Sequence, residues 1–128
     1  QLNADTTQKA QLAMTRLTKE FGAIQSVTSG SGSSITYVRP DDTLSLVTVT
    51  VTRSGDQLLI NDNPLTDNVS EFTLQYCSYE NLDEGSACSA SWISAGSEPS
   101  KIIEIELTLQ GAANTNSTFT KRVAPRNL

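Results

Sequence analysis

The strongest constraint on the fold is a change in the period of the apolar residues near residue 34. Before this point, apolar side chains recur at the i, i+3, i+4 and i+7 spacing of an amphipathic helix. After it, apolar and polar residues alternate, which is typical of strands with one buried face. The sequence therefore predicts one helix followed by β-structure. The apolar stripe of this helix consists of Ala10, Ala13, Met14, Leu17, Phe21 and Ile24.

The two ends of the helix are marked unequally. Gly22 weakens the last turns, and the polar residues 26–34 are rich in Ser and Gly, which do not continue a helix. At the other end, Asp5 could cap the helix, but Leu2 lies at the edge of the apolar face. The possibility that the helix continues from an upstream segment therefore stays open. We predict a helix over about residues 5–27.

Alternation is clearest at Leu46–Arg53, where three valines alternate with three threonines. A sheet with one dry face needs a cover, and the helical stripe supplies one. We therefore predict one domain over residues 1–128, of the α+β class, with an N-terminal helix packed on an antiparallel meander of five or six strands. This β-region spans about residues 34–124. The predicted strands are 35–39, 46–53, 57–61, 69–79, 101–110 and 117–123.

The composition excludes several classes of function. The chain has no histidine, so Ser-His-Asp and Cys-His catalysis lack their base. Fourteen acidic against nine basic residues give a net charge of −5, which does not attract nucleic acid. Glu104 and Glu106 share one face of a predicted strand, where we interpret them as solvated residues opposite Lys121 rather than a catalytic pair. We therefore predict that the protein is not an enzyme.

The two cysteines, Cys77 and Cys88, lie 11 positions apart in a polar stretch. This spacing fits a local disulfide better than a zinc site, which needs four ligands and would here lack histidine. A disulfide indicates an oxidising compartment and hence a secreted or envelope protein. Two free thiols in a cytosolic protein are the alternative.

Two segments raise the question of a bound cation or ligand. Asn61–Asn68 offers oxygen ligands of the kind that calcium prefers, but it lacks the spacing of an EF-hand loop, and its residue types also suit a plain turn. The long connection 78–100 is acidic, with Asp83 and Glu84 in its first half. Trp92 in the same connection either anchors a partner or holds its own loop against the domain. We expect no cofactor, with calcium as the alternative.

The order of elements resembles that of type IV pilins and of the pseudopilins of type II secretion. The helical segment Leu12–Phe21 is similar to the second half of the long helix in J-type minor pseudopilins and PilW-like minor pilins. Several later segments follow the order of the same family, and the resemblance covers nearly the whole chain. These segments are Ile35–Val38, Val51–Ile60, Leu65–Tyr76, Lys101–Leu109 and Arg122–Asn127.

The resemblance implies a pilin-like fold for this α+β domain. It also implies a non-catalytic minor pilin or pseudopilin that helps to initiate or cap a pilus or a secretion pseudopilus. Its domain would lie in the periplasm of a bacterial envelope, held in the inner membrane by an apolar half-helix upstream of this sequence. Its partners would be other minor and major subunits. Leu12 projects away from the apolar stripe, and the implied assembly surface is the outer face of the helix, formed by Gln8, Leu12, Thr15 and Lys19.

The position of the cysteines and a rival hypothesis bear on this interpretation. The pair Cys77 and Cys88 is not in the C-terminal position of the disulfide that marks many major pilins, which argues against a major pilin. The rival hypothesis is a free secreted binding module that uses the acidic 78–100 connection to hold a ligand or calcium. An apolar run of about 20 residues directly upstream would favour the pilin hypothesis.

Overall fold

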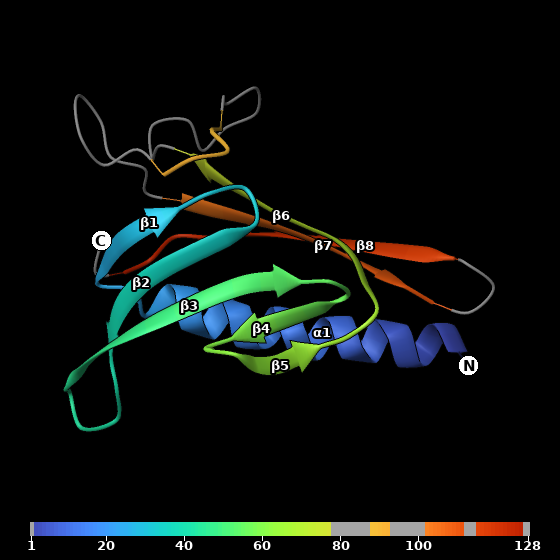
Figure 1. Cartoon of the computed structure of the whole chain (residues 1–128), viewed down its shortest axis with the longest axis horizontal. Helices are drawn as coiled ribbons and strands as arrows, with labels where there is room; N and C mark the ends of the chain where they lie inside the picture. Colours follow the sequence, from blue (N-terminus) through green and yellow to red (C-terminus); the bar gives the residue numbers. More distant parts are fainter. Residues whose placement is uncertain (1, 78–87, 93–101, 112–114, 127–128) are drawn as a thin grey trace.

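The computed structural model describes residues 2–77, 88–92, 102–111 and 115–126. It contains one N-terminal helix, α1 (Leu2–Gly22), and eight antiparallel strands in two sheets (Figure 1). The five-stranded sheet has the order β1-β2-β3-β4-β5, and the three-stranded sheet has the order β6-β7-β8. The strands are β1 (Ser26–Gly30), β2 (Ser34–Pro40), β3 (Leu46–Ser54), β4 (Gln57–Ile60), β5 (Asn63–Thr66), β6 (Val69–Cys77), β7 (Ile102–Gln110) and β8 (Asn116–Val123).

The predicted fold class is wrong. The described chain is mostly β and forms two sheets, so it is not a pilin-like α+β fold with a single meander of five or six strands. The break between the sheets falls at Asp67 and Asn68, where Asn68 takes a left-handed backbone conformation with φ 56°. Asparagine tolerates this conformation better than most residues. The chain bends there, and β6 pairs with β7 instead of β5.

Two of the eight strands were not expected from the sequence. β1 contains Ser26–Gly30, whose only large apolar residue is Val27, so its sequence lacks the alternation of a half-buried strand. β5 contains Pro64, which is tolerated because β5 is an edge strand. Both strands are held mainly by backbone pairing with one neighbour, a feature that hydrophobic periodicity does not report.

The other six strands are confirmed over the described residues, while residues 78, 79 and 101 of two predicted strands lie outside them. In β3, Val49 and Val51 are buried while Thr48 is exposed, and in β7 the predicted apolar positions Ile103, Ile105, Leu107 and Leu109 are buried. The β4–β5 turn consists of Asn61 and Asp62, which both have positive φ, 50° and 68°. A two-residue hairpin with this geometry prefers Asn and Asp, so the turn explains these residue types without a bound ion.

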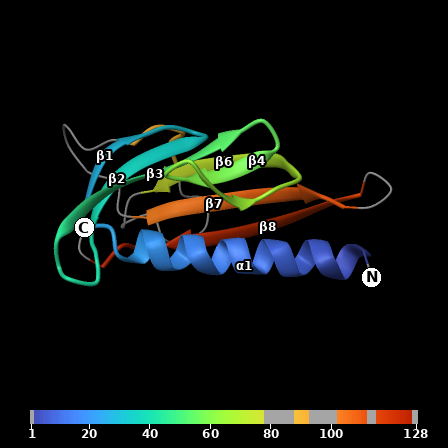
Figure 2. The ribbon, with the colours of Figure 1, turned by 60° about the horizontal axis from the view of Figure 1, so that its bottom comes forward.

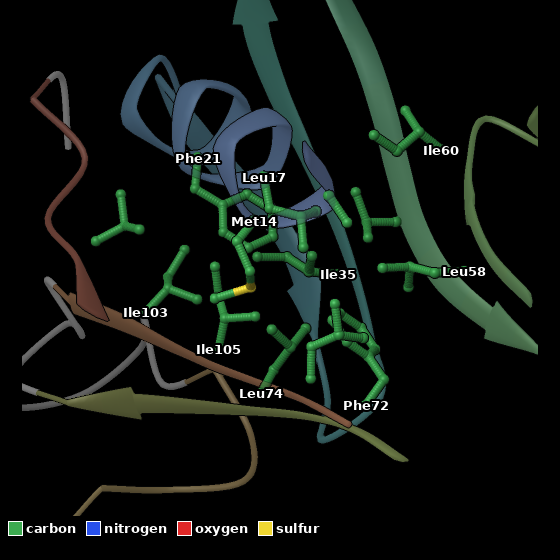
Figure 3. Close-up of a cluster of buried hydrophobic side chains, with 14 of the residues drawn as sticks. Met14, Leu17, Phe21, Ile35, Leu58, Ile60, Phe72, Leu74, Ile103 and Ile105 are labelled. Carbon is green, nitrogen blue, oxygen red and sulfur yellow. The ribbon is translucent and has the colours of Figure 1, made fainter. Parts of the chain in front are cut away.

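The inner face of α1 is buried from Thr6 to Phe21. Leu17, Phe21 and Ala10 are fully buried, and Met14 is 8% exposed. The helix runs beside β7 and β8 across the three-stranded sheet, and the five-stranded sheet curves over the rest of its inner face (Figure 2). Figure 3 shows the side chains of α1 that point into one cluster shared by both sheets. The labelled members are Met14, Leu17, Phe21, Ile35, Leu58, Ile60, Phe72, Leu74, Ile103 and Ile105.

The helix ends earlier than the predicted residue 27. The amide N–H groups of Ala23 and Ile24 donate to the carbonyls of Glu20 and Phe21, three residues back, which tightens the last turn. Gln25 then donates to the carbonyl of Val38 in β2, so the backbone has already joined the sheet. Ile24 stays buried after the helix has ended, and its apolar phase alone made the helix look longer.

Candidate functional site

The four residues of the predicted assembly surface lie on one stripe of α1. Gln8, Leu12, Thr15 and Lys19 are spaced by four, three and four positions, which places them above one another on a helix, and all four are exposed. Leu12 is 66% exposed, although the opposite face of the same helix is buried. We call these four residues the outer stripe. It is a continuous surface that the domain does not use for its own packing.

A groove of about 610 Å³ runs beside the outer stripe, between α1 and the edge strand β8. Met14 is almost fully buried and contributes an apolar part of its lining. Thr15 and Lys19 belong both to the groove and to the outer stripe, so the two form one connected surface. The lining residues are Gln11, Met14, Thr15, Thr18, Lys19 and Lys121.

The groove has a positive charge. Two lysines and no acidic residue line it, and neither lysine forms an ion pair with any residue that the structure describes. By contrast, the other two basic residues of α1 are paired: Lys9 lies 2.8 Å from Asp67, and Arg16 lies 3.6 Å from Glu20. The hydrogen bond from Lys9 lowers the pKa of Asp67. The unpaired lysines make the groove suited to an acidic partner.

Sequence reasoning missed the contribution of β8 to this surface. Lys121 pairs with Ile105, whose side chain is buried in the core, so both residues lie on the same side of the sheet. Because β8 is an edge strand beside the helix, Lys121 still reaches solvent there. Phe119 and Val123 alternate with Lys121, and this pattern could have placed it next to α1. Glu104, expected opposite Lys121, instead pairs with Arg122 at 2.8 Å.

A buried charge cluster lies at the C-terminal end of α1, against β2. Glu20 is only 6% exposed, and its Oε1 accepts hydrogen bonds from Tyr37 Oη and Arg39 Nε, both at 2.7 Å. Burial, and then the hydrogen bond to Glu20, raise the pKa of Tyr37 above its usual value, so Tyr37 stays neutral. Arg39 also donates from Nη1 to the carbonyl of Pro40. This cluster was not anticipated from the sequence.

The disulfide between Cys77 and Cys88 is present, as the spacing predicts. Cys77 is fully buried at the end of β6, and Ser89 forms a β-bridge with Tyr76 next to it. The disulfide and the β-bridge together hold residues 88–92 against the three-stranded sheet. Trp92 packs edge-to-face on Tyr76 at 5.6 Å between ring centroids, which supports the interpretation that it holds its own loop.

Replacing both cysteines by alanine should destabilise the protein. In the chain-entropy account, closing a loop of this length contributes about 3 kcal/mol. We expect the free energy of unfolding in urea to fall by about this amount, with the three-stranded sheet still formed. Treating the unchanged protein with a reductant should give a similar loss. A double variant as stable as the oxidised protein would show that the bridge has no stabilising role.

The segments considered for calcium are only partly described. Asn61–Thr66 forms the β4–β5 turn and β5, and Asn61 and Asn63 line a pocket with Arg16 and Arg39, whose charges disfavour a cation. Asp83, Glu84 and most of the acidic 78–100 connection lie outside the described residues. Within the described ranges, no group of three or more His, Cys, Asp or Glu side chains is placed to hold a metal ion.

Neither a scan against models of known protein families nor a search of the curated proteins gives a match to this chain. In the part of the chain that the structure describes, no helix is both long and apolar enough to cross a membrane.

Proposed function

We propose that this chain is a structural subunit without catalytic activity, a minor pilin or pseudopilin that helps to initiate or cap a filament of the cell envelope. The outer stripe of α1 and the adjoining groove are its contact surface for a neighbouring subunit. The observation that carries the proposal is the exposure of Leu12 on a helix whose other face is fully occupied. The resemblance of the sequence to minor pseudopilins supports the same function.

The surface has the properties of a protein contact. An exposed leucine supplies an apolar centre, and the threonine and glutamine side chains around it supply hydrogen-bonding groups. Lys19 and Lys121 add two positive charges that are free to pair with a neighbour's carboxylates. A head-to-tail contact that uses different surfaces on the two partners extends as a filament when the rotation between successive subunits does not close into a ring.

The proposal requires no reaction centre. Glu104, half of the carboxylate pair considered from the sequence, is paired with Arg122, and the buried carboxylate of Glu20 is occupied by Tyr37 and Arg39. The proposal covers two kinds of filament, a pilus and a secretion pseudopilus.

The test is to mix the chain with other minor subunits of the same filament system and to measure complex formation by light scattering. We expect a complex with the unchanged chain. Leu12→Asp should weaken it about thirtyfold, because it places a charge at the centre of the contact. Stability should change by less than about 0.5 kcal/mol, since Leu12 makes no core contact.

Leu44→Asp is the matched control. Leu44 is 82% exposed in the β2–β3 loop and belongs neither to the outer stripe nor to the groove lining, so its replacement adds the same charge to another exposed leucine. This variant should form the complex as the unchanged chain does. Equal loss of binding in both variants, or no complex with any subunit, would overturn the proposed contact surface.

A further inference from the structure

A small polar pocket of about 180 Å³ lies between α1 and the five-stranded sheet, apart from the outer stripe. Two arginines line it, Arg16 from the helix and Arg39 from β2, together with two asparagines of the β4–β5 hairpin. None of these four residues has a role in the proposed assembly surface. The full lining is Arg16, Arg39, Val49, Ile60, Asn61, Asn63, Pro64 and Leu65.

The charges of the pocket do not balance. Glu20 is the buried carboxylate of the cluster, and both guanidinium groups share it: Arg39 Nε at 2.7 Å from Oε1 and Arg16 Nε at 3.6 Å from Oε2. Tyr37 is neutral and donates to the same carboxylate. Among the groups in direct contact at the pocket, two positive charges against one negative charge leave a surplus of one positive charge, while the carboxylates of Asp41 and Asp42 act on Arg39 from outside the lining.

Both arginines keep unused donors. Arg39 donates through Nε to Glu20 and through Nη1 to Pro40, which leaves Nη2 without a partner among the described residues. Arg16 Nε lies 3.6 Å from Glu20 Oε2, and the side chain of Arg16 is 52% exposed. A guanidinium group carries five N–H donors in a planar fork that matches an oxyanion. Each arginine can therefore bind a second acceptor without giving up Glu20.

The asparagines add donors of fixed orientation. Asn61 Oδ1 accepts a hydrogen bond from the backbone N–H of Thr50 at 2.9 Å, so the amide nitrogen is the group left over on this side chain. Asn61 is also held by its backbone N–H, which donates to the carbonyl of Thr50. Asn63 Nδ2 lies 3.4 Å from the carbonyl of Asn61 and retains a second N–H. The polar lining is thus made mostly of donors.

We propose that this pocket binds a single carboxylate group, of the size of an aspartate or glutamate side chain, between Arg16 and Arg39. A carboxylate carries one negative charge and matches the surplus of one positive charge. A phosphate dianion would leave a negative charge uncompensated in a partly buried site. The pocket volume suits a small acidic group rather than a nucleotide or a cofactor. This inference does not depend on the proposed assembly function.

The test uses the ¹⁵N-labelled chain and sodium acetate as the probe, titrated at constant ionic strength with chloride as the counter-titrant. We expect saturating shifts of the Nε–H signals of Arg16 and Arg39 and of the side-chain amides of Asn61 and Asn63. The dissociation constant should fall in the millimolar range open to so small a ligand. Shifts that rise linearly without saturation would overturn the proposal.

Three variants make the test specific. Arg16→Gln should weaken acetate binding about tenfold, because it removes a charge-assisted donor. The affinity of Arg16→Lys for acetate should fall between those of the unchanged chain and Arg16→Gln, since lysine keeps the charge but loses the planar fork. Lys9→Gln removes another exposed basic residue of α1 and should change the affinity less than about twofold. Equal affinity in Arg16→Gln and the unchanged chain, or tighter binding of phosphate than of acetate, would contradict a carboxylate site.

Discussion

Leu17→Ala should lower the free energy of unfolding by about 3 to 4 kcal/mol. Leu17 is fully buried in the middle of α1, where it packs in the cluster that both sheets share. Removing three carbon atoms loses their transfer free energy and leaves a cavity that residues of three different elements would have to collapse to fill. Urea unfolding followed by far-ultraviolet circular dichroism gives the change directly.

Leu12→Ala is the matched control, because it makes the same substitution five positions earlier in the same helix. Leu12 is 66% exposed, so its replacement should change the stability by less than about 0.5 kcal/mol. Helix propensity barely differs between leucine and alanine, so the two variants isolate burial. Similar losses at positions 12 and 17 would contradict the assignment of an inner and an outer face to α1.

Glu20→Gln should destabilise the protein by about 2 kcal/mol, and Glu20→Ala by about 3 to 4 kcal/mol. The buried carboxylate accepts hydrogen bonds from Tyr37 and Arg39 at 2.7 Å, and its loss leaves a half-buried guanidinium without its counter-charge. Glutamine keeps the shape and one acceptor oxygen, which is why its effect is smaller. Chemical denaturation at pH 7 measures both variants.

One control variant and one further measurement separate the role of the Glu20 cluster from a general loss of charge. Glu71 is exposed in β6, and Glu71→Gln should leave stability within about 0.5 kcal/mol. In Glu20→Gln, the pKa of Tyr37 should fall towards its usual value, because the carboxylate that helps to raise it is gone. An unchanged stability of Glu20→Gln would show that the cluster is not a structural tie between α1 and β2.

Periodicity predicted the elements that are stabilised by side-chain burial. The stripe from Ala10 to Phe21 and the alternation in β3 and β7 are direct consequences of one buried face, and all three are confirmed. β1 and β5 are held by backbone pairing with a neighbour, and their sequences carry no such pattern. The division into two sheets falls at Asn68, whose left-handed backbone conformation a single asparagine in a polar stretch does not reveal.

The candidate surfaces too could be predicted from the sequence only in part. The outer stripe follows from helical spacing alone, and the structure places its four residues together as exposed side chains. The groove needs Lys121, which lies in the last strand and far along the sequence from the helix beside it, and only tertiary packing joins them. The pair Arg16 and Arg39 is likewise assembled by the buried carboxylate of Glu20, a residue whose position at the edge of the stripe gave no sign of burial.

The central claim is that the outer stripe of α1 contacts a neighbouring subunit. Its most direct test is to place a photo-crosslinking amino acid at position 12 or at position 44 of the full-length protein, in cells that assemble the filament. The account predicts a cross-link from position 12 to another filament subunit and none from position 44. The absence of a cross-link at position 12 in assembling cells, or equal cross-linking at both positions, would contradict it.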